Sequence, residues 1–129
     1  MIVLDTHVWL RWIQKDHTLL KSHWVEQIAD SERVGVSAIS CFEVAWLAQH
    51  ARIQLPEPLD SWFEKALAGS SIDLIALTPQ IARIAVQLPE HHRDPQDRLI
   101  IAIALAHDAM LISADRKFPL YNELQGRLL

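Results

Sequence analysis

Four short apolar segments, separated from one another by stretches with helical periodicity, constrain the fold of this chain more than any other feature. The segments cover residues 1–4, 33–37, 72–77 and 110–113, and each has the length of a buried strand. A strand that returns to its sheet through a helix normally runs parallel to the strand before it. The sequence therefore predicts an α/β fold: a short central parallel sheet of four to five strands, flanked by helices on both faces.

Start and stop signals divide the segments between these strands into helices. Thr78-Pro79 and Asp94-Pro95 each place a capping side chain before a proline at the first helical position. Gly69 is expected to end the helix before the third strand. The predicted helices cover residues 6–14, 19–30, 40–52, 59–68, 79–88 and 95–107, and a last short strand is expected at 127–129.

Length and composition predict one globular domain over residues 1–129, because no linker, repeat or low-complexity segment interrupts the chain. The first apolar run ends at Asp5, and the later run 99–106 is shorter than the ~20 residues that span a bilayer. Cys41 is the only cysteine and is expected to be a small buried side chain in a helix. We therefore expect a cytoplasmic protein.

The net charge limits the function classes. The 12 lysines and arginines are outnumbered by 16 aspartates and glutamates, which gives −4 at pH 7. This balance argues against a protein that coats nucleic acid by bulk charge. It still permits an enzyme that meets phosphates through a bound metal and a local basic rim.

Carboxylates stand where the predicted strands end and where helices begin. Asp5 follows the first strand, Glu43 lies in the first turn of the helix after the second, Asp94 and Asp97 open the last long helix, and Asp115 lies just beyond the last strand. In a parallel sheet these positions meet at the carboxyl edge, where such folds bind ligands. The sequence thus predicts an acid cluster assembled from four distant segments.

An acid cluster of this kind favours a hard cation. Crowded carboxylates repel one another unless a positive charge lies among them, and oxygen ligands favour Mg²⁺ or Mn²⁺. No set of cysteines and histidines has zinc-like spacing. A magnesium site completes its shell with water and phosphate and can activate that water. Phosphodiester hydrolysis is the reaction class that follows.

Helix capping is the alternative interpretation of each acid. Ser40 and Glu43 have the spacing of a capping box, and Asp94 is a good N-cap with Asp97 favourable to the helix dipole. The remaining acids can act as caps as well. Taken singly, each is more often a cap than a catalytic group; their joint placement favours a site.

Four blocks make the chain similar to a known family. They are VLDTH at 3–7, VSAISCFEVA at 36–45, HRDPQDRLIIA at 92–102 and LISADRKF at 111–118. In order and spacing they resemble the PIN-domain family, and within it the VapC-type toxins of prokaryotic toxin–antitoxin pairs. The resemblance implies a Mg²⁺-dependent endoribonuclease, with Mn²⁺ able to substitute. It also implies a homodimer and a cognate antitoxin whose peptide fills the active-site groove.

The resemblance assigns roles to particular positions. Asp5, Glu43, Asp97 and Asp115 correspond to the four metal-binding and catalytic acids, and Asp94 becomes an auxiliary neighbour. Thr6 and Ser113 match polar positions beside the site, where they would orient ligands by hydrogen bonds. Relatives often have a lysine shortly after the second acid, where this chain has Trp46 and Leu47.

Basic residues flank the predicted site. Arg93, Arg98, Arg116 and Lys117 are candidates for contacts to RNA phosphates. The alternative is a solvated charge or an ion pair. For Arg98 the two interpretations are balanced, and for the others the structural one is preferred.

Histidines and tryptophans receive mainly structural interpretations. His7, His91 and His92 lie nearest the motifs, but a metal already supplies an activated water, so a surface or capping role is preferred for all seven histidines. The tryptophans lie in predicted helices, which favours core or interface over base stacking. Four of them are candidates for a subunit or antitoxin surface: Trp9, Trp12, Trp46 and Trp62.

Two other functions compete with the ribonuclease. A phosphatase of the haloacid dehalogenase kind also opens with a strand ending in Asp, but it needs a second Asp two residues later, and His7 stands there. The other alternative is a catalytically silent PIN-like module that binds RNA or protein. The acids are all present, which favours activity. The identity of the RNA target stays open, among transfer, ribosomal and messenger RNA.

Overall fold

The chain folds around a four-stranded parallel sheet. A computed structural model describes residues 1–129, with the strands in the order β3-β2-β1-β4. The strands are β1 (Ile2–Leu4), β2 (Val34–Ser37), β3 (Ile72–Ile75) and β4 (Met110–Ile112). Every neighbouring pair is parallel, which confirms the predicted fold class.

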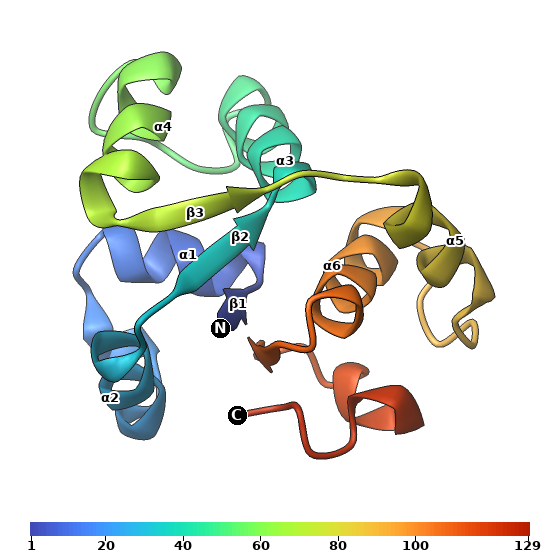
Figure 1. Ribbon diagram of the computed structural model, residues 1–129. Helices are drawn as coiled ribbons and strands as arrows, with labels where there is room; N and C mark the ends of the chain where they lie inside the picture. The colour runs from blue at the N-terminus through green and yellow to red at the C-terminus, as the bar shows by residue number, and fades with distance from the viewer.

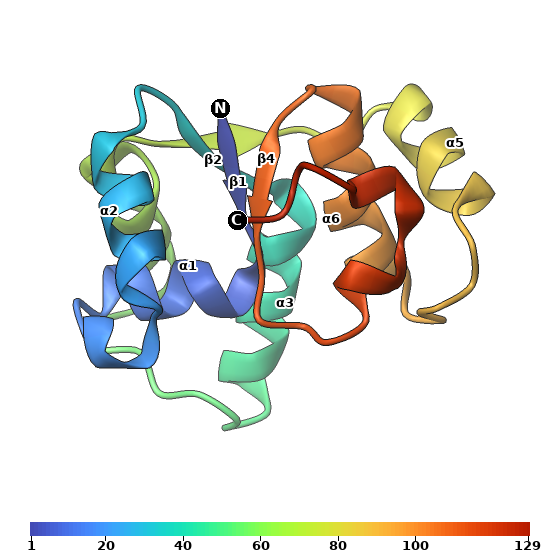
Figure 2. The same ribbon diagram turned by 90° about the horizontal axis from the view of Figure 1, so that it is seen from below.

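Six α-helices surround the sheet (Figure 1). They are α1 (Thr6–Ile13), α2 (Ser22–Asp30), α3 (Ala38–Gln49), α4 (Leu59–Ala66), α5 (Pro79–Gln87) and α6 (Pro95–Ala106). Short 3₁₀ turns cover His17–Leu19, Ala68–Ser70, Phe118–Leu120 and Asn122–Leu124. Both views place α1, α2 and α4 on one side of the sheet and α5 and α6 on the other (Figures 1 and 2).

Side chains that alternate between the two faces of the sheet form two hydrophobic cores, one on each side. In β1, Ile2 and Leu4 join the cluster that packs against α1, α2 and α4, whereas Val3 joins the cluster under α5 and α6. In β4, Ile112 and Leu111 divide in the same way. Successive strand side chains point to opposite faces, so a strand covered on both faces needs apolar residues at every position, as β1 and β4 have.

Tryptophan placement corrects part of the interface prediction. Trp9 and Trp62 are 0% and 2% exposed and pack edge to face in the first core, with ring centroids 5.0 Å apart. They are therefore unavailable to a partner in the folded chain. Trp46 is 43% exposed, and Trp12 is only partly buried. These two tryptophans therefore remain candidates for a subunit or antitoxin surface.

Several predicted boundaries were wrong by a few residues. Helix α3 begins at Ala38 rather than Ser40, with Ser37 as N-cap. Gly69 does not end α4; it lies in the 3₁₀ turn Ala68–Ser70. The last strand predicted at 127–129 reduces to one isolated bridge, between Leu111 and Leu128. These differences leave the order of elements unchanged.

The topology gathers the ends of several elements at the carboxyl edge of the sheet. Helix α1 leaves this edge after β1, and α3 leaves it after β2. Helix α6 precedes β4, so in this parallel arrangement its N-terminus lies near the same edge. None of the helices combines the length and apolarity that crossing a bilayer requires.

Candidate active site

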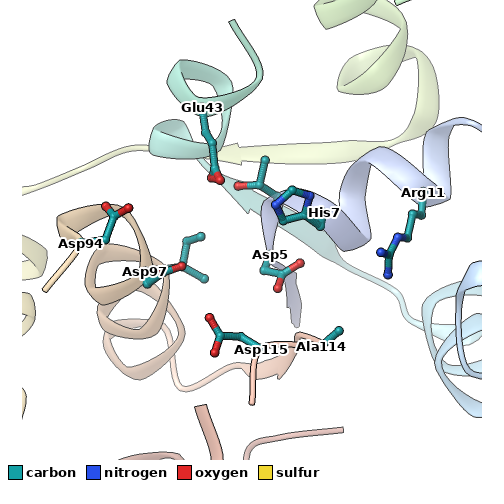
Figure 3. A pocket seen from close by; sticks show the side chains of 10 residues that line it. Asp5, His7, Arg11, Glu43, Asp94, Asp97, Ala114 and Asp115 are labelled. Atoms are coloured by element: carbon teal, nitrogen blue, oxygen red, sulfur yellow. The ribbon is translucent and has the colours of Figure 1, made fainter. Parts of the chain in front are cut away.

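A cleft of about 360 Å³ opens at the carboxyl edge of the sheet (Figure 3). Segments distant in sequence contribute its walls: the start of α1, helix α3, the start of α6 and the loop after β4. Its lining is mostly polar and consists of Asp5, Thr6, His7, Arg11, Glu43, Asp94, Asp97, Ile100, Ala114 and Asp115. The structure thus brings the acids singled out in the sequence to one place.

Asp5 is fixed by two hydrogen bonds. Its Oδ1 accepts the backbone N–H of Val8 at 2.8 Å, so Asp5 is the N-cap of α1. Its Oδ2 accepts the hydroxyl of Ser113 at 2.5 Å. The capping and site interpretations are therefore compatible, because a cap uses one carboxylate oxygen and leaves the other at the cleft.

Asp94 and Asp97 occupy different places on α6. Asp94 is the N-cap, with Oδ1 accepting the backbone N–H of Gln96 at 3.0 Å. Asp97 lies in the first helical turn, and its Oδ2 is 4.0 Å from Nε2 of His92. Asp97 makes no capping hydrogen bond of its own, so its carboxylate is available to a ligand in the cleft.

Glu43 does not belong to a capping box. Because α3 begins two residues earlier than predicted, Ser37 is its N-cap, with Oγ accepting the N–H of Ile39 at 3.1 Å. Glu43 therefore lies in the second turn of the helix. The buried Ser40 instead accepts the hydroxyl of Thr6 at 2.9 Å, a bond that joins α3, which carries Glu43, to α1, which Asp5 caps.

Asp115 is held by its own loop and by a histidine. Its Oδ1 accepts the N–H of Lys117 at 2.8 Å, and its own N–H donates to the hydroxyl of Ser113 at 3.0 Å. Its Oδ2 lies 3.0 Å from Nε2 of His92. Asp115 caps no α-helix; it closes a tight turn directly after β4.

Two of the cleft acids, Asp5 and Asp97, have raised pKa values, mainly because they are buried. Burial raises the pKa of Asp97 to about 6; the His92 ring lowers it in part, and the negative charges of Asp115, Asp94 and Glu43 raise it further. Burial also raises the pKa of Asp5, against the hydrogen bonds from Ser113 and Val8. Such shifts are expected where carboxylates crowd without a cation. The oxygen-only set of acids fits a hard divalent ion.

The sequence did not predict the role of His92, although it named the residue. It is only 5% exposed and contacts Asp115, Asp97 and Tyr121, so its surface interpretation was wrong. With Asp97 and Asp115 it forms a group whose ligand atoms all lie within 4.8 Å of one another. The one signal in the sequence was its position at the start of the block that carries Asp97.

Arg98 has a structural set of contacts. Its guanidinium donates to the carbonyl oxygens of Val86, Leu88, Pro89 and His92 at 2.7–3.2 Å. These contacts engage most of its donors and leave little for an RNA phosphate. They instead fix the loop between α5 and α6.

The other basic residues are distributed differently from the expectation. Arg93, Arg116 and Lys117 are exposed and do not line the cleft. The basic side chain at the cleft is Arg11, and His7 lies beside it in the lining; the two are four residues apart and therefore on one face of α1. Sequence reasoning did not consider Arg11, although this spacing after Asp5 was visible.

An α/β fold with a carboxylate-lined cleft at the edge of a parallel sheet defines the class of site that metal-dependent nucleases use. Residues 2–124 match the model of the PIN domain. The chain therefore belongs to the PIN-domain family, as the four blocks predicted. This membership sets aside the phosphatase alternative.

One relative in sequence and two solved structures of similar fold are consistent with membership of the PIN-domain family. The chain is 37% identical over 117 residues to Ribonuclease VapC22 of Mycobacterium tuberculosis (strain ATCC 25618 / H37Rv), covering 90% of this chain and 88% of that protein. Its fold is similar to that in the crystal structure of VapBC2 from Rickettsia felis bound to a promoter DNA fragment, with 20% identity, a TM-score of 0.70, and coverage of 100% and 98%. A toxin–antitoxin complex from Klebsiella pneumoniae has the same identity, a TM-score of 0.63, and coverage of 100% and 96%.

Proposed function

We propose that this protein is a metal-dependent endoribonuclease and the toxin of a toxin–antitoxin pair. The observation that carries the proposal is the convergence of Asp5, Glu43, Asp97 and Asp115 on one cleft. Burial, with a smaller contribution from neighbouring acids, raises the pKa values of Asp5 and Asp97, and a bound cation would offset this cost of charging them. Similarity to a protein named as a ribonuclease supports RNA as the substrate.

Asp5, Asp97, Glu43 and Asp115 would hold the metal, which we propose to be Mg²⁺ with Mn²⁺ able to substitute. When bound, the ion would polarise the phosphate, lower the pKa of a coordinated water and stabilise the leaving oxygen. Asp94 lines the same cleft while its Oδ1 caps α6, and we propose it as an auxiliary acid beside the four ligands. Thr6 would act indirectly, through its bond to Ser40 in α3.

The chain's own residues would place the RNA. His7 and Arg11 lie on one wall of the cleft, where they can bind phosphates beside the scissile bond. Arg93 and Arg116 are exposed outside the cleft and would contact RNA only beyond it. Because the net charge is −4 and the protein as a whole repels RNA, a local cation such as Arg11 would help to hold the phosphates.

An antitoxin partner is proposed because two solved structures of similar fold come from a VapBC pair and a toxin–antitoxin complex. On this chain, a second hollow of about 310 Å³ adjoins the acidic cleft and shares Glu43 and Asp94 with it. Its apolar wall includes Phe42 and Trp46, 58% and 43% exposed. A peptide anchored there would extend over the cleft and block it.

A homodimer is proposed as well. The edge strand β3 leaves Leu74 54% exposed, and Leu77 just after it is 41% exposed. Exposed apolar side chains at a sheet edge favour association. Sedimentation equilibrium should give about twice the chain mass of 14.7 kDa, and a monomer at micromolar concentration would contradict this part of the proposal.

Cleavage of RNA in Mn²⁺, in Mg²⁺ and in EDTA tests the central proposal, with Asp5→Asn as control. Cleavage that requires metal and disappears in the variant supports it. Equal cleavage by both proteins would mean a contaminating nuclease or a structural role for Asp5. No cleavage together with no metal binding would favour the alternative, a catalytically silent module that binds RNA or protein.

A further inference from the structure

His92 occupies the junction between the acid cleft and the C-terminal segment. Its Nε2 lies 3.0 Å from Oδ2 of Asp115, and its Nδ1 lies 2.9 Å from the hydroxyl of Tyr121. The backbone N–H of His92 donates to the same hydroxyl at 3.1 Å. Both ring nitrogens of a 5% exposed side chain therefore have partners, as burial of polar atoms requires.

The position of His92 is fixed from several sides. Arg98 donates to its carbonyl oxygen at 3.2 Å. The ring lies parallel to that of Tyr121, with an interplanar angle of 8° and centroids 5.6 Å apart, and meets Phe118 edge-on at 5.3 Å. Packing, backbone bonds and ring bonds thus agree on one orientation, so the ring is placed before any ligand enters the cleft.

The carboxylate of Asp115 can only accept a hydrogen bond, so its contact with His92 requires a proton on Nε2. In the neutral ring, Nδ1 is then an acceptor. The Tyr121 hydroxyl, which accepts the backbone N–H of His92, has a proton of its own to donate to Nδ1. Tyr121 is therefore a partner that matches the tautomer with its donor directed at the acid.

The contact with Asp115 continues to Asp5. Asp115 donates its N–H to Ser113 at 3.0 Å, and Ser113 donates its hydroxyl to Asp5 at 2.5 Å. One chain of hydrogen bonds therefore joins Tyr121, His92, Asp115, Ser113 and Asp5. It crosses from the C-terminal segment through the loop after β4 to the residue that follows β1.

We propose that His92 is a positioning residue of the metal site: its Nε2–H donor, oriented by Tyr121, holds the Asp115 carboxylate in the orientation that binds the cation. The inference rests on the proposed function. Groups that orient metal ligands typically contribute about 10- to 100-fold to metal affinity or activity. His92 acts here through a ligand, and the C-terminal segment becomes part of the site's framework.

Two substitutions separate the effect of the Nε2–H donor of His92 from the effect of its aromatic ring. His92→Phe keeps an aromatic ring between Tyr121 and Phe118 but removes the donor. His92→Gln removes the ring but keeps an amide N–H that can reach Asp115. His91→Phe is the matched control, because His91 is the exposed neighbour and does not contact the acids; its one aromatic contact is edge-on with Tyr121, which a phenyl ring can also make.

Calorimetric titration with Mn²⁺ alone, without RNA, measures the effect directly. We expect His92→Phe to weaken Mn²⁺ binding about 10- to 100-fold, His92→Gln to retain most of the affinity, and His91→Phe to bind like wild type. In RNA cleavage, the Mn²⁺ concentration for half-maximal rate should rise in His92→Phe by a similar factor, with kcat largely recovered at saturating Mn²⁺. If His92 contributed only packing, neither the amide of His92→Gln nor saturating Mn²⁺ would be expected to restore function.

The possible outcomes distinguish a failure of the inference about His92 from a failure of the proposed function on which it rests. Equal Mn²⁺ affinity in His92→Phe and wild type overturns the inference, as does equal weakening in His92→Phe and His92→Gln. Wild-type protein that binds no Mn²⁺ overturns the proposed function and the inference with it. If His92→Phe fails to fold, Tyr121→Phe replaces it: loss of the hydroxyl should weaken Mn²⁺ binding, and unchanged affinity overturns the inference.

Discussion

Ser113 donates its hydroxyl to Oδ2 of Asp5 at 2.5 Å, although 108 residues separate them in sequence. The bond follows from sheet register: Leu4 pairs with Ile112, so the next residue of each strand leaves the sheet beside the other. The register of two parallel strands thus places an acid and the hydroxyl that orients it at the same corner of the cleft.

Asp5→Asn should separate function from stability. The amide oxygen of Asn can still accept the N–H of Val8 and cap α1, while the charge needed for a cation is lost. We expect metal-dependent RNA cleavage to fall by more than about 100-fold, since loss of even an outer group costs about 10- to 100-fold. Because burial raises the pKa of Asp5, the charged form is unfavourable without metal, and the melting temperature of the variant should equal or exceed that of wild type. A variant that is active, or that melts far below wild type, would refute this.

Without metal, the protein should lose stability as the pH rises from about 4 to above 6. The pKa of Asp97 is raised from 3.8 to about 6 in the folded chain, so between these values the folded state binds more protons than the unfolded state. The slope of unfolding free energy with pH is then negative. Stability from this group is complete below pH 3.8 and is lost as the pH passes through about 6.

Asp97→Asn isolates this contribution, because it removes the titrating group and leaves the rest of the cleft in place. Thermal melts in EDTA at several pH values should show a smaller fall in melting temperature between pH 4 and pH 7 for Asp97→Asn than for wild type. Parallel curves for the two proteins would show that Asp97 does not titrate as described.

Much of the fold was predictable because its signals are local. Each strand is a short, mainly apolar run, and Pro79 and Pro95 mark the starts of α5 and α6 as expected. The positions of the acids followed from one topological rule, that parallel strands end at a common edge. The start of α3 was missed because Ser37 and Ser40 both satisfy the capping pattern, and only the tertiary bond from Thr6 to Ser40 decides between them.

The roles of His92 and Arg98 were not predictable in this way. His92 depends on Tyr121, which is 29 residues away and lies in a segment without regular pattern. The role of Arg98 depends on the path of the loop between α5 and α6, because the guanidinium donates hydrogen bonds to the carbonyl oxygens of that loop. A sequence pattern describes neighbours along a helix or strand, whereas these contacts depend on where irregular segments meet.

Arg98→Ala should destabilise the protein by about 1 to 2 kcal/mol, because it removes a charged donor from four carbonyl oxygens, of which those of Leu88 and His92 are partly buried. Arg98→Lys should recover only part of this, since one ammonium group cannot reach all the carbonyls that the planar guanidinium does. Urea denaturation measures both. Arg93→Ala is the control and should change stability by less than about 0.5 kcal/mol, because its side chain is exposed. Wild-type stability in Arg98→Ala together with weaker RNA binding would restore the phosphate-contact interpretation.

Divalent metal should stabilise the folded chain in a way that depends on the cleft acids. A ligand that binds only the folded state at 100 times its Kd adds about 2.7 kcal/mol, which for a domain of this size raises the melting temperature by roughly 10 °C. The rise with Mn²⁺ should be larger at pH 7 than at pH 5, because protons on Asp97 compete with the cation.

Two variants locate the cation that causes this rise. Asp5→Asn should lose most of the rise in melting temperature. Asp30 is an exposed acid at the end of α2, so Asp30→Asn should keep the rise. A shift that is equal in both variants would place the cation elsewhere on the surface and contradict the site described above.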